Sequence, residues 1–290
     1  MTSLWQRVPV IVRAILVGLL VNEVGQLGAV FIFPNLKFLP QVPWMLAAAA
    51  VWLWGFWRYV SGSGWPQATR ETRRRDLRAT PITGIVWRWS LLAGGLGLLS
   101  MVGLAFLTPR LAEIPRDAFK LASPVDLSAY PLWTVVSILL VCSVVAGVAE
   151  EAAFRGYMLS QIERRHGWIV ATIITGVMFY LVHYVSHAYA TVAFLPFFLA
   201  VSAVHARLVY LTGSILPSIV LHAAFDFAVI PFQYGLIGAI PLSSVLETGV
   251  DSSFWLEVAI TLVFAAAAVP AFRKLAEVTC QLRECRGAMR

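Results

Sequence analysis

Long apolar runs alternate with short polar segments along the whole chain. A run of about 20 apolar residues is the length that one α-helix needs to cross a lipid bilayer. The pattern therefore predicts an all-α fold, a polytopic membrane helix bundle of about eight transmembrane helices. It also predicts a single integral membrane domain over residues 1–290. The expected spans cover residues 8–33, 42–60, 83–107, 131–153, 168–187, 189–211, 214–234 and 254–272.

The composition is that of a membrane protein rather than a soluble one. The mean hydropathy is +0.78, and only 13% of the residues are charged. The net charge of +7 would suggest nucleic acid in a soluble protein. The arginines, however, lie in short segments between apolar runs, where they act as topology signals and contact lipid headgroups. We expect the lipid bilayer as a partner and no nucleic acid.

The positions of the basic clusters predict the orientation in the membrane. Three clusters fall on one side of an eight-span chain: the segment 61–82, the segment after the fourth span and the C-terminal tail. The intervening connections are acidic or balanced, as around Arg110. Because cytoplasmic segments are enriched in lysine and arginine, both termini are expected in the cytoplasm. The segment Ser61 to Thr80 is expected to be a basic loop, with Trp65, that lies on anionic headgroups.

Two adjacent acids and an arginine follow the fourth apolar run directly: Glu150, Glu151 and Arg155. A charged side chain within a membrane helix costs roughly 2.5 to 3.5 kcal/mol, so such residues indicate a functional site. In an α-helix Glu150 and Glu151 point about 100° apart, whereas Glu151 and Arg155 share one face. We expect Glu151 to pair with Arg155 and Glu150 to act as a general base. The opposite assignment stays open, as does a purely structural role for both acids.

Two later apolar runs carry histidines. His183 shares a helix face with Phe179, and His222 shares one with Asp226. The imidazole of His222 can donate a hydrogen bond to a developing oxyanion, and Asp226 can hold that imidazole in position. His205, in the sixth span, is expected to extend toward the membrane interface rather than to catalyse.

The depth of these residues in the bilayer constrains the fourth helix. If that helix ended near residue 153, Glu150 would lie at the cytoplasmic rim and His183 about 22 Å deeper along its own helix. The two side chains could not then share a site. We therefore expect the fourth helix to continue past Arg155 through Leu159, and the fifth helix to start later or to tilt.

The three polar groups resemble the motifs of a family of membrane proteases. The motifs are Glu-Glu-x-x-x-Arg at 150–155, Phe-x-x-x-His at 179–183 and His-x-x-x-Asx at 222–226. In this order they resemble the CAAX-processing and bacteriocin-processing (CPBP) family of glutamic-type intramembrane proteases, which includes the Ras-converting CAAX endopeptidases. The run from Tyr210 to Pro217 is also similar to the family's approach to its last motif. The similarity covers residues 145–230, and the protease-like core is expected within 131–236.

The resemblance implies an intramembrane endopeptidase that hydrolyses a peptide bond in a membrane-tethered protein or peptide substrate. It implies that the site of this multi-pass protein faces the cytoplasmic side, in the inner membrane of a bacterium. The implied residues are Glu150 to activate water, His183, His222 and Asp226 around the scissile carbonyl, and Glu151, Arg155 and Phe179 in supporting roles. Asp226 departs from the asparagine that is typical of prenyl-protein endopeptidases. Because an ionised aspartate cannot donate a hydrogen bond, Asp226 is either protonated or serves to orient His222.

Two functional questions stay open at this point. No cofactor is expected, and the chain has no His-Glu-x-x-His signature. The alternative is a zinc site built from Glu150, Glu151, His183 and His222, since a catalytic zinc needs only three ligands and a water. The alternative function is a non-proteolytic membrane scaffold, or a bacteriocin-immunity-type protein, of the same fold. A transporter is disfavoured because paired Gly- or Pro-broken spans in two matching halves are not apparent.

Overall fold

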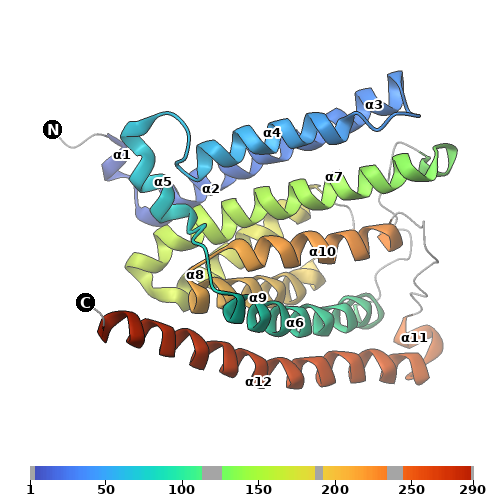
Figure 1. Ribbon diagram of the computed structural model, residues 1–290. Helices are drawn as coiled ribbons and strands as arrows, with labels where there is room; N and C mark the ends of the chain where they lie inside the picture. The colour runs from blue at the N-terminus through green and yellow to red at the C-terminus, as the bar shows by residue number, and fades with distance from the viewer. Residues whose placement is uncertain (1–3, 113–125, 187–191, 234–243, 289–290) are drawn as a thin grey trace. The chain divides into compact units, whose positions relative to one another are not determined.

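The structure of the protein is a computed structural model that describes residues 4–112, 126–186, 192–233 and 244–288 (Figure 1). Every regular element in these ranges is helical, so the predicted all-α fold class is confirmed. The elements are α1 (Leu4–Arg7), α2 (Val10–Gln26), η1 (Leu27–Phe31), α3 (Ile32–Phe38), α4 (Met45–Val60), η2 (Gln67–Thr69), α5 (Arg70–Leu77), α6 (Gly84–Leu111), η4 (Leu127–Ala129), α7 (Leu132–Glu150), η5 (Glu151–Met158), α8 (Leu159–Ser186), η6 (Val192–Phe194), α9 (Leu195–Thr212), α10 (Leu216–Gln233), α11 (Val245–Thr248) and α12 (Ser252–Ala288).

Helices long and apolar enough to cross a membrane account for most of the predicted spans, and the chain is an integral membrane protein. Among the described residues these are five stretches: Val10–Phe38, Gly84–Leu111, Leu132–Val185, Val192–Thr212 and Ser252–Leu282. Two predicted spans share the 54-residue stretch Leu132–Val185, and two others coincide with the shorter helices α4 and α10. Residues 187–191 and 234 of the predicted spans lie outside the described residues. The count of eight spans and the cytoplasmic position of both termini stay predictions.

The helix that carries Glu150 continues well beyond it. α7 passes directly into η5, a π-helical segment, and then into α8. The continuity ends at Gly167, whose φ of 80° and ψ of 164° interrupt α8. Glycine adopts a positive φ without strain because it lacks a Cβ atom. The expectation that the fourth helix runs on past Arg155 is therefore confirmed, while the fifth helix starts near the predicted residue 168 rather than later.

The chain divides into two compact units, each assembled from segments far apart in sequence. The first unit comprises Met1–Ala79, Ala122–Thr175 and Ser218–Ile237, and the second comprises Thr80–Leu121, Gly176–Pro217 and Gly238–Arg290. The organisation as one domain stays a prediction.

In the first unit, α2, α4 and α7 pack together around an apolar core. Its buried residues include Leu36, Met45 and Val145. Small residues let α2 lie close to α7: a Cβ atom added at Gly25 would stand 2.5 Å from the Cβ of Ala149. This close packing fixes the end of α2 beside the end of α7, where Glu150 lies.

The segment predicted to be a basic loop is folded onto α8. It contains the helix α5, and the guanidinium of Arg73 is buried, where it donates hydrogen bonds to the backbone carbonyls of Tyr59, Gly64 and Pro66. Asp76, also buried, lies 2.8 Å from the guanidinium of Arg164 on α8. Part of the positive charge of the segment is thus used within the protein, and its contact with headgroups stays a prediction.

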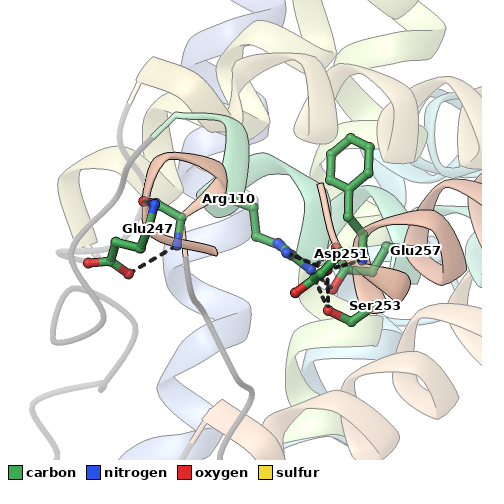
Figure 2. A network of polar contacts seen from close by, with 7 residues as sticks. Arg110, Glu247, Asp251, Ser253 and Glu257 are labelled. Carbon is green, nitrogen blue, oxygen red and sulfur yellow. Dashed lines mark hydrogen bonds and ion pairs between the residues drawn. The ribbon is translucent and has the colours of Figure 1, made fainter. Parts of the chain in front are cut away.

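In the second unit, α6 packs along α12, and a network around Arg110 joins their ends (Figure 2). The guanidinium of Arg110 is 1% exposed and lies 2.8 Å from Asp251 and 3.3 Å from Glu257. It also donates a hydrogen bond of 2.7 Å to the hydroxyl of Ser253. Arg110 is therefore a buried residue of the last turn of α6, whereas the sequence suggested a charge in a polar connection.

Candidate active site

Glu150 and Glu151 lie where α7 changes into the π-helical segment η5. All eight residues of η5 are buried, and Glu150 is 8% exposed. π-helical segments are rare and occur frequently at functional sites, because the wider turn displaces side chains from their α-helical positions. The segment therefore brings charged side chains into the interior of the first unit.

Glu151 and Arg155 form a fully buried ion pair within η5. The Nη1 atom of Arg155 lies 3.1 Å from Oε1 of Glu151, and the two side chains are 1% and 0% exposed. The guanidinium also lies 6.0 Å from the ring centre of Phe154. The predicted pairing of Glu151 with Arg155 is confirmed. The supporting role of the two residues in catalysis stays a prediction.

The helix α10 approaches α7 closely because α7 has a glycine at the crossing. A Cβ atom added at Gly147 would stand 3.0 Å from the backbone nitrogen of Ala223 and 3.1 Å from the carbonyl oxygen of Ile219. Both atoms belong to the backbone of α10 and cannot move aside independently. Gly147 thus sets the distance at which α10 presents its side chains to Glu150 and Glu151.

His222 of α10 contacts three carboxyl groups. Its Nδ1 lies 2.8 Å from Oε1 of Glu151, and its Nε2 lies 3.5 Å from both Oε2 of Glu150 and Oδ2 of Asp226. A carboxylate can only accept, so Nδ1 carries the proton in its hydrogen bond with an ionised Glu151. This fixes the ring with Nε2 facing Glu150 and Asp226.

The two carboxyl oxygens of Glu150 have different surroundings. The side-chain amide of Gln26, from the end of α2, donates a hydrogen bond of 3.0 Å to Oε1. The other oxygen, Oε2, is buried and accepts no hydrogen bond from the residues that the structure describes. One oxygen is therefore held by the protein, while the other can accept a hydrogen bond from a small polar molecule such as water.

The cluster contains more acidic than basic groups. Among the residues of the first unit, Glu150, Glu151 and Asp226 lie near the guanidinium of Arg155 and the imidazole of His222. A buried ion without a partner of opposite charge costs several kcal/mol. The arginine and the histidine are therefore expected to be necessary for the cluster to form. Because its members lie close together, proton transfer among them requires little movement.

The predicted pair of Phe179 and His183 lies in the second unit. Nδ1 of His183 is 2.8 Å from the carbonyl oxygen of Phe179, one helical turn earlier. The ring centres of Phe179 and His183 are 4.5 Å apart. The ring centre of Phe198 lies 4.7 Å from that of His183. Because a carbonyl only accepts, Nδ1 donates. That His183 acts together with Glu150 stays a prediction.

Two polar residues of interest were not recognised from the sequence. Gln26 is the last residue of α2, and the only available signal was an amide at the end of an apolar run. His205 is 1% exposed, so the expectation that it extends to the interface is wrong. A histidine in the middle of an apolar helix gives no indication of whether it faces lipid or the protein interior.

In the first unit, Glu150, Glu151 and Asp226 offer carboxylate oxygens around the imidazole of His222. Carboxylate and imidazole are both ligands of zinc. However, the guanidinium of Arg155 already lies 3.1 Å from Glu151, and a second cation at that carboxylate would be repelled. Arg155 would thus compete with a divalent ion for Glu151, and a reaction without metal stays a prediction.

Helical membrane proteins with a buried cluster of acids and an imidazole include intramembrane hydrolases, and the comparison with known families agrees with this class. Residues 131–228 match the model of the family described as type II CAAX prenyl endopeptidase Rce1-like. The matched segment contains Glu150, Glu151, His183, His222 and Asp226. The predicted resemblance to this family is confirmed.

At the level of the family, the match supports an intramembrane endopeptidase of the CAAX-protease kind, a hydrolase that works in the lipid bilayer on a membrane-associated substrate. No curated protein and no solved structure matches the chain.

Proposed function

We propose that the protein is an intramembrane endopeptidase in which Glu150 activates the water that hydrolyses a peptide bond of a membrane-tethered protein or peptide. The observation that carries the proposal is the asymmetry of Glu150. Its Oε1 is held by Gln26, while its buried Oε2 accepts no hydrogen bond from the described residues and lies 3.5 Å from His222. A general base needs such an oxygen within hydrogen-bond reach of its water.

The remaining groups complete a hydrolytic mechanism. As the oxygen of water bonds to the scissile carbonyl carbon, Glu150 takes up the proton of the water. His222 acts as the doubly protonated imidazolium: its Nδ1–H stays on Glu151, and its Nε2–H donates to the carbonyl oxygen as that oxygen gains negative charge. Glu151 keeps His222 oriented through Nδ1, and Arg155 stabilises Glu151. Glu150 then returns the proton to the leaving amine as the C–N bond breaks. His183 positions the substrate or the water, and Asp226 orients His222.

The proposed reaction needs no metal. The support for this is the position of Arg155, which already supplies a positive charge to Glu151. The expected result is that purified protein cleaves its substrate equally fast with and without a zinc chelator. A loss of activity with chelator that added zinc restores would instead favour the zinc site.

We also propose that the protein is a multi-pass protein of a bacterial inner membrane with both termini in the cytoplasm and the site open toward that side. The support is the distribution of the basic segments along the chain. Labelling of single cysteines introduced at exposed positions such as Glu71 and Lys274 in intact cells tests this orientation, since both positions are expected to be shielded from an impermeant reagent.

The experiment that tests the protease function compares wild type with Glu150→Gln in lipid vesicles. The readouts are cleavage of quenched fluorescent peptides with a C-terminal CAAX sequence, with and without a prenyl group, and new chain ends in membranes from cells that express either protein. The variant is expected to lose cleavage by about 100-fold or more, the range that a general base contributes. Glu71→Gln, at an exposed position on α5, is the matched control and should cleave normally.

Two outcomes would overturn the proposal. Glu150→Gln could produce the same products at the same rate as wild type, which would exclude this residue as the base. Alternatively, the peptides and the membranes both yield no product that depends on the protein. The scaffold function would then replace the protease function.

A further inference from the structure

A pocket of about 550 Å³ lies between α9 and α12 in the second unit. Arg207 of α9 lines one side, and Val269, Phe272 and Arg273 of α12 line the other. None of these residues belongs to the cluster around Glu150. The pocket is therefore a separate feature of the protein.

The wall of the pocket changes from apolar to basic along α12. Residues 258–272 contain no charged side chain, and Arg273 and Lys274 follow at once. Ala268, Val269 and Phe272 line the apolar part, and the pocket continues to Glu277, about 14 Å further along the helix than Ala268. The change of polarity coincides with the end of the apolar run, where a membrane helix passes from hydrocarbon into the headgroup layer.

The residues that line the basic end of the pocket include more cations than acids. Two guanidinium groups line it, those of Arg207 and Arg273. The one acid among the lining residues, Glu277, is paired with Lys274, whose Nζ lies 3.0 Å from Oε2. Arg207 is the only charged residue of α9, and its guanidinium carbon lies 5.5 Å from the ring centre of Tyr210. Stacking on an aromatic ring limits the motion of a guanidinium.

We propose that this pocket binds an anionic phospholipid, with the phosphate between Arg207 and Arg273 and an acyl chain along Val269 and Phe272. Guanidinium groups bind phosphate oxygens through paired N–H donors, and basic pockets between membrane helices are suited to anionic headgroups. A free phosphate would occupy the basic end and leave the apolar wall without a partner. A zwitterionic lipid would bring a third positive charge beside the two arginines.

The test measures lipid binding to the full-length protein in detergent by native mass spectrometry. Phosphatidylglycerol and phosphatidylcholine with the same acyl chains are titrated separately, and inorganic phosphate is titrated in a third series. Wild type is expected to bind one phosphatidylglycerol more tightly than any phosphatidylcholine. In Arg207→Gln/Arg273→Gln this affinity should fall by about fivefold for each arginine, roughly 25-fold in total.

Matched variants separate a defined site from general surface charge. Arg74→Gln/Arg165→Gln removes the same charge at exposed positions of the first unit and should leave the tight binding unchanged. Arg207→Lys/Arg273→Lys keeps both charges and should retain most of the affinity. Phe272→Ala shortens the apolar wall and should weaken phosphatidylglycerol binding. Thermal unfolding of each variant confirms that it is folded.

Three results would overturn the proposal. Equal binding of phosphatidylcholine and phosphatidylglycerol by wild type would exclude recognition of the anionic headgroup. An equal loss of binding in Arg74→Gln/Arg165→Gln would show that the attraction is spread over the surface. Inorganic phosphate that binds as tightly as the lipid, and is unaffected by Phe272→Ala, would identify a simple anion site. Because the readout is binding, these outcomes are independent of whether the protein is a protease.

Discussion

The imidazole of His222 donates from Nδ1 to the carboxylate of Glu151 across 2.8 Å, and this contact joins α10 to the π-helical segment η5. The same carboxylate also receives Arg155, so one oxygen, Oε1, serves both partners. Glu151 thus has an orienting position for the histidine in addition to its ion pair. The contact connects two of the three motifs of the chain within one buried cluster.

The buried ion pair predicts a large effect of Arg155→Met on stability. Without Arg155, the carboxylate of Glu151 would remain buried next to two other acids without its cation. Removing one partner of a buried pair costs about 3 to 5 kcal/mol. We expect a loss of that size in the free energy of unfolding, measured by SDS-induced or thermal unfolding of purified protein.

An exposed pair provides the control for this prediction. Arg74 and Glu71 are 46% and 88% exposed at a separation of 3.9 Å, and Arg74→Met should cost about 1 kcal/mol or less. Adding Glu151→Gln to Arg155→Met should recover part of the lost stability, because it removes the unpaired charge. Equal stabilities of Arg155→Met and Arg74→Met would contradict a buried, energetically important pair.

The crossing of α7 and α10 predicts a specific cost at Gly147. In Gly147→Ala the new methyl group would meet backbone atoms of α10 at 3.0 to 3.1 Å, so the helices must separate. Overpacking of this kind costs about 1 to 3 kcal/mol. Gly55→Ala is the matched control, because a Cβ atom there meets nothing within 4 Å and the substitution favours the helix α4 by about 0.5 to 1 kcal/mol. Unfolding measurements should thus give opposite signs for the two variants, and the same sign would count against the close crossing.

The sequence was sufficient for the features that depend on local periodicity. Within the described residues, the apolar segments lie in helices, because about 20 apolar residues in a row have few other stable arrangements in a bilayer. The pair of Glu151 and Arg155 was predictable for a similar reason, since a helix always brings residues four apart onto one face. The π-helical form of η5 does not disturb this pairing.

The contacts between distant segments were not predictable in the same way. Gln26 and Glu150 are 124 residues apart, and Glu151 and His222 are 71 residues apart. Such contacts depend on which helices pack together and at what rotation, and periodicity does not determine either. The sequence accordingly suggested Asp226 as the residue that orients His222, while Glu151 makes the shorter contact. The burial of Arg110 also depends on a distant partner, the start of α12.

The hydrogen bond from Gln26 predicts an effect on catalysis if Glu150 is the base. In Gln26→Leu the carboxylate would lose the donor that holds Oε1, and a hydrogen bond to a charged group contributes about 1.5 to 3 kcal/mol. We expect kcat to fall by about 10-fold or more with little change in KM, because the observed role of Gln26 is to hold the base. Gln67→Leu, at an exposed position, is the control. A variant Gln26→Leu with wild-type kcat would show that Glu150 is positioned without this amide.

The network around Arg110 predicts a dependence of stability on pH. The backbone N–H of Phe254, followed by the side chains of Arg110 and Ser253, lowers the pKa of Asp251 to about 2. In the unfolded chain an aspartate has a pKa of about 3.9. Because the folded state holds the ionised form more firmly, the contribution of Asp251 to stability is complete above about pH 4 and is lost as the pH falls toward 2.

The variant Asp251→Asn isolates this charge, since asparagine keeps an oxygen that can accept from Phe254 at the start of α12. Thermal unfolding in detergent should show wild type with the higher Tm at pH 6, and the difference between the two proteins should shrink between pH 4 and pH 2. The direction follows from the sign of the shift: a lowered pKa in the folded state stabilises at high pH and not at low pH. A Tm difference that stays constant from pH 6 to pH 2 would mean that the charge of Asp251 does not stabilise the contact between α6 and α12.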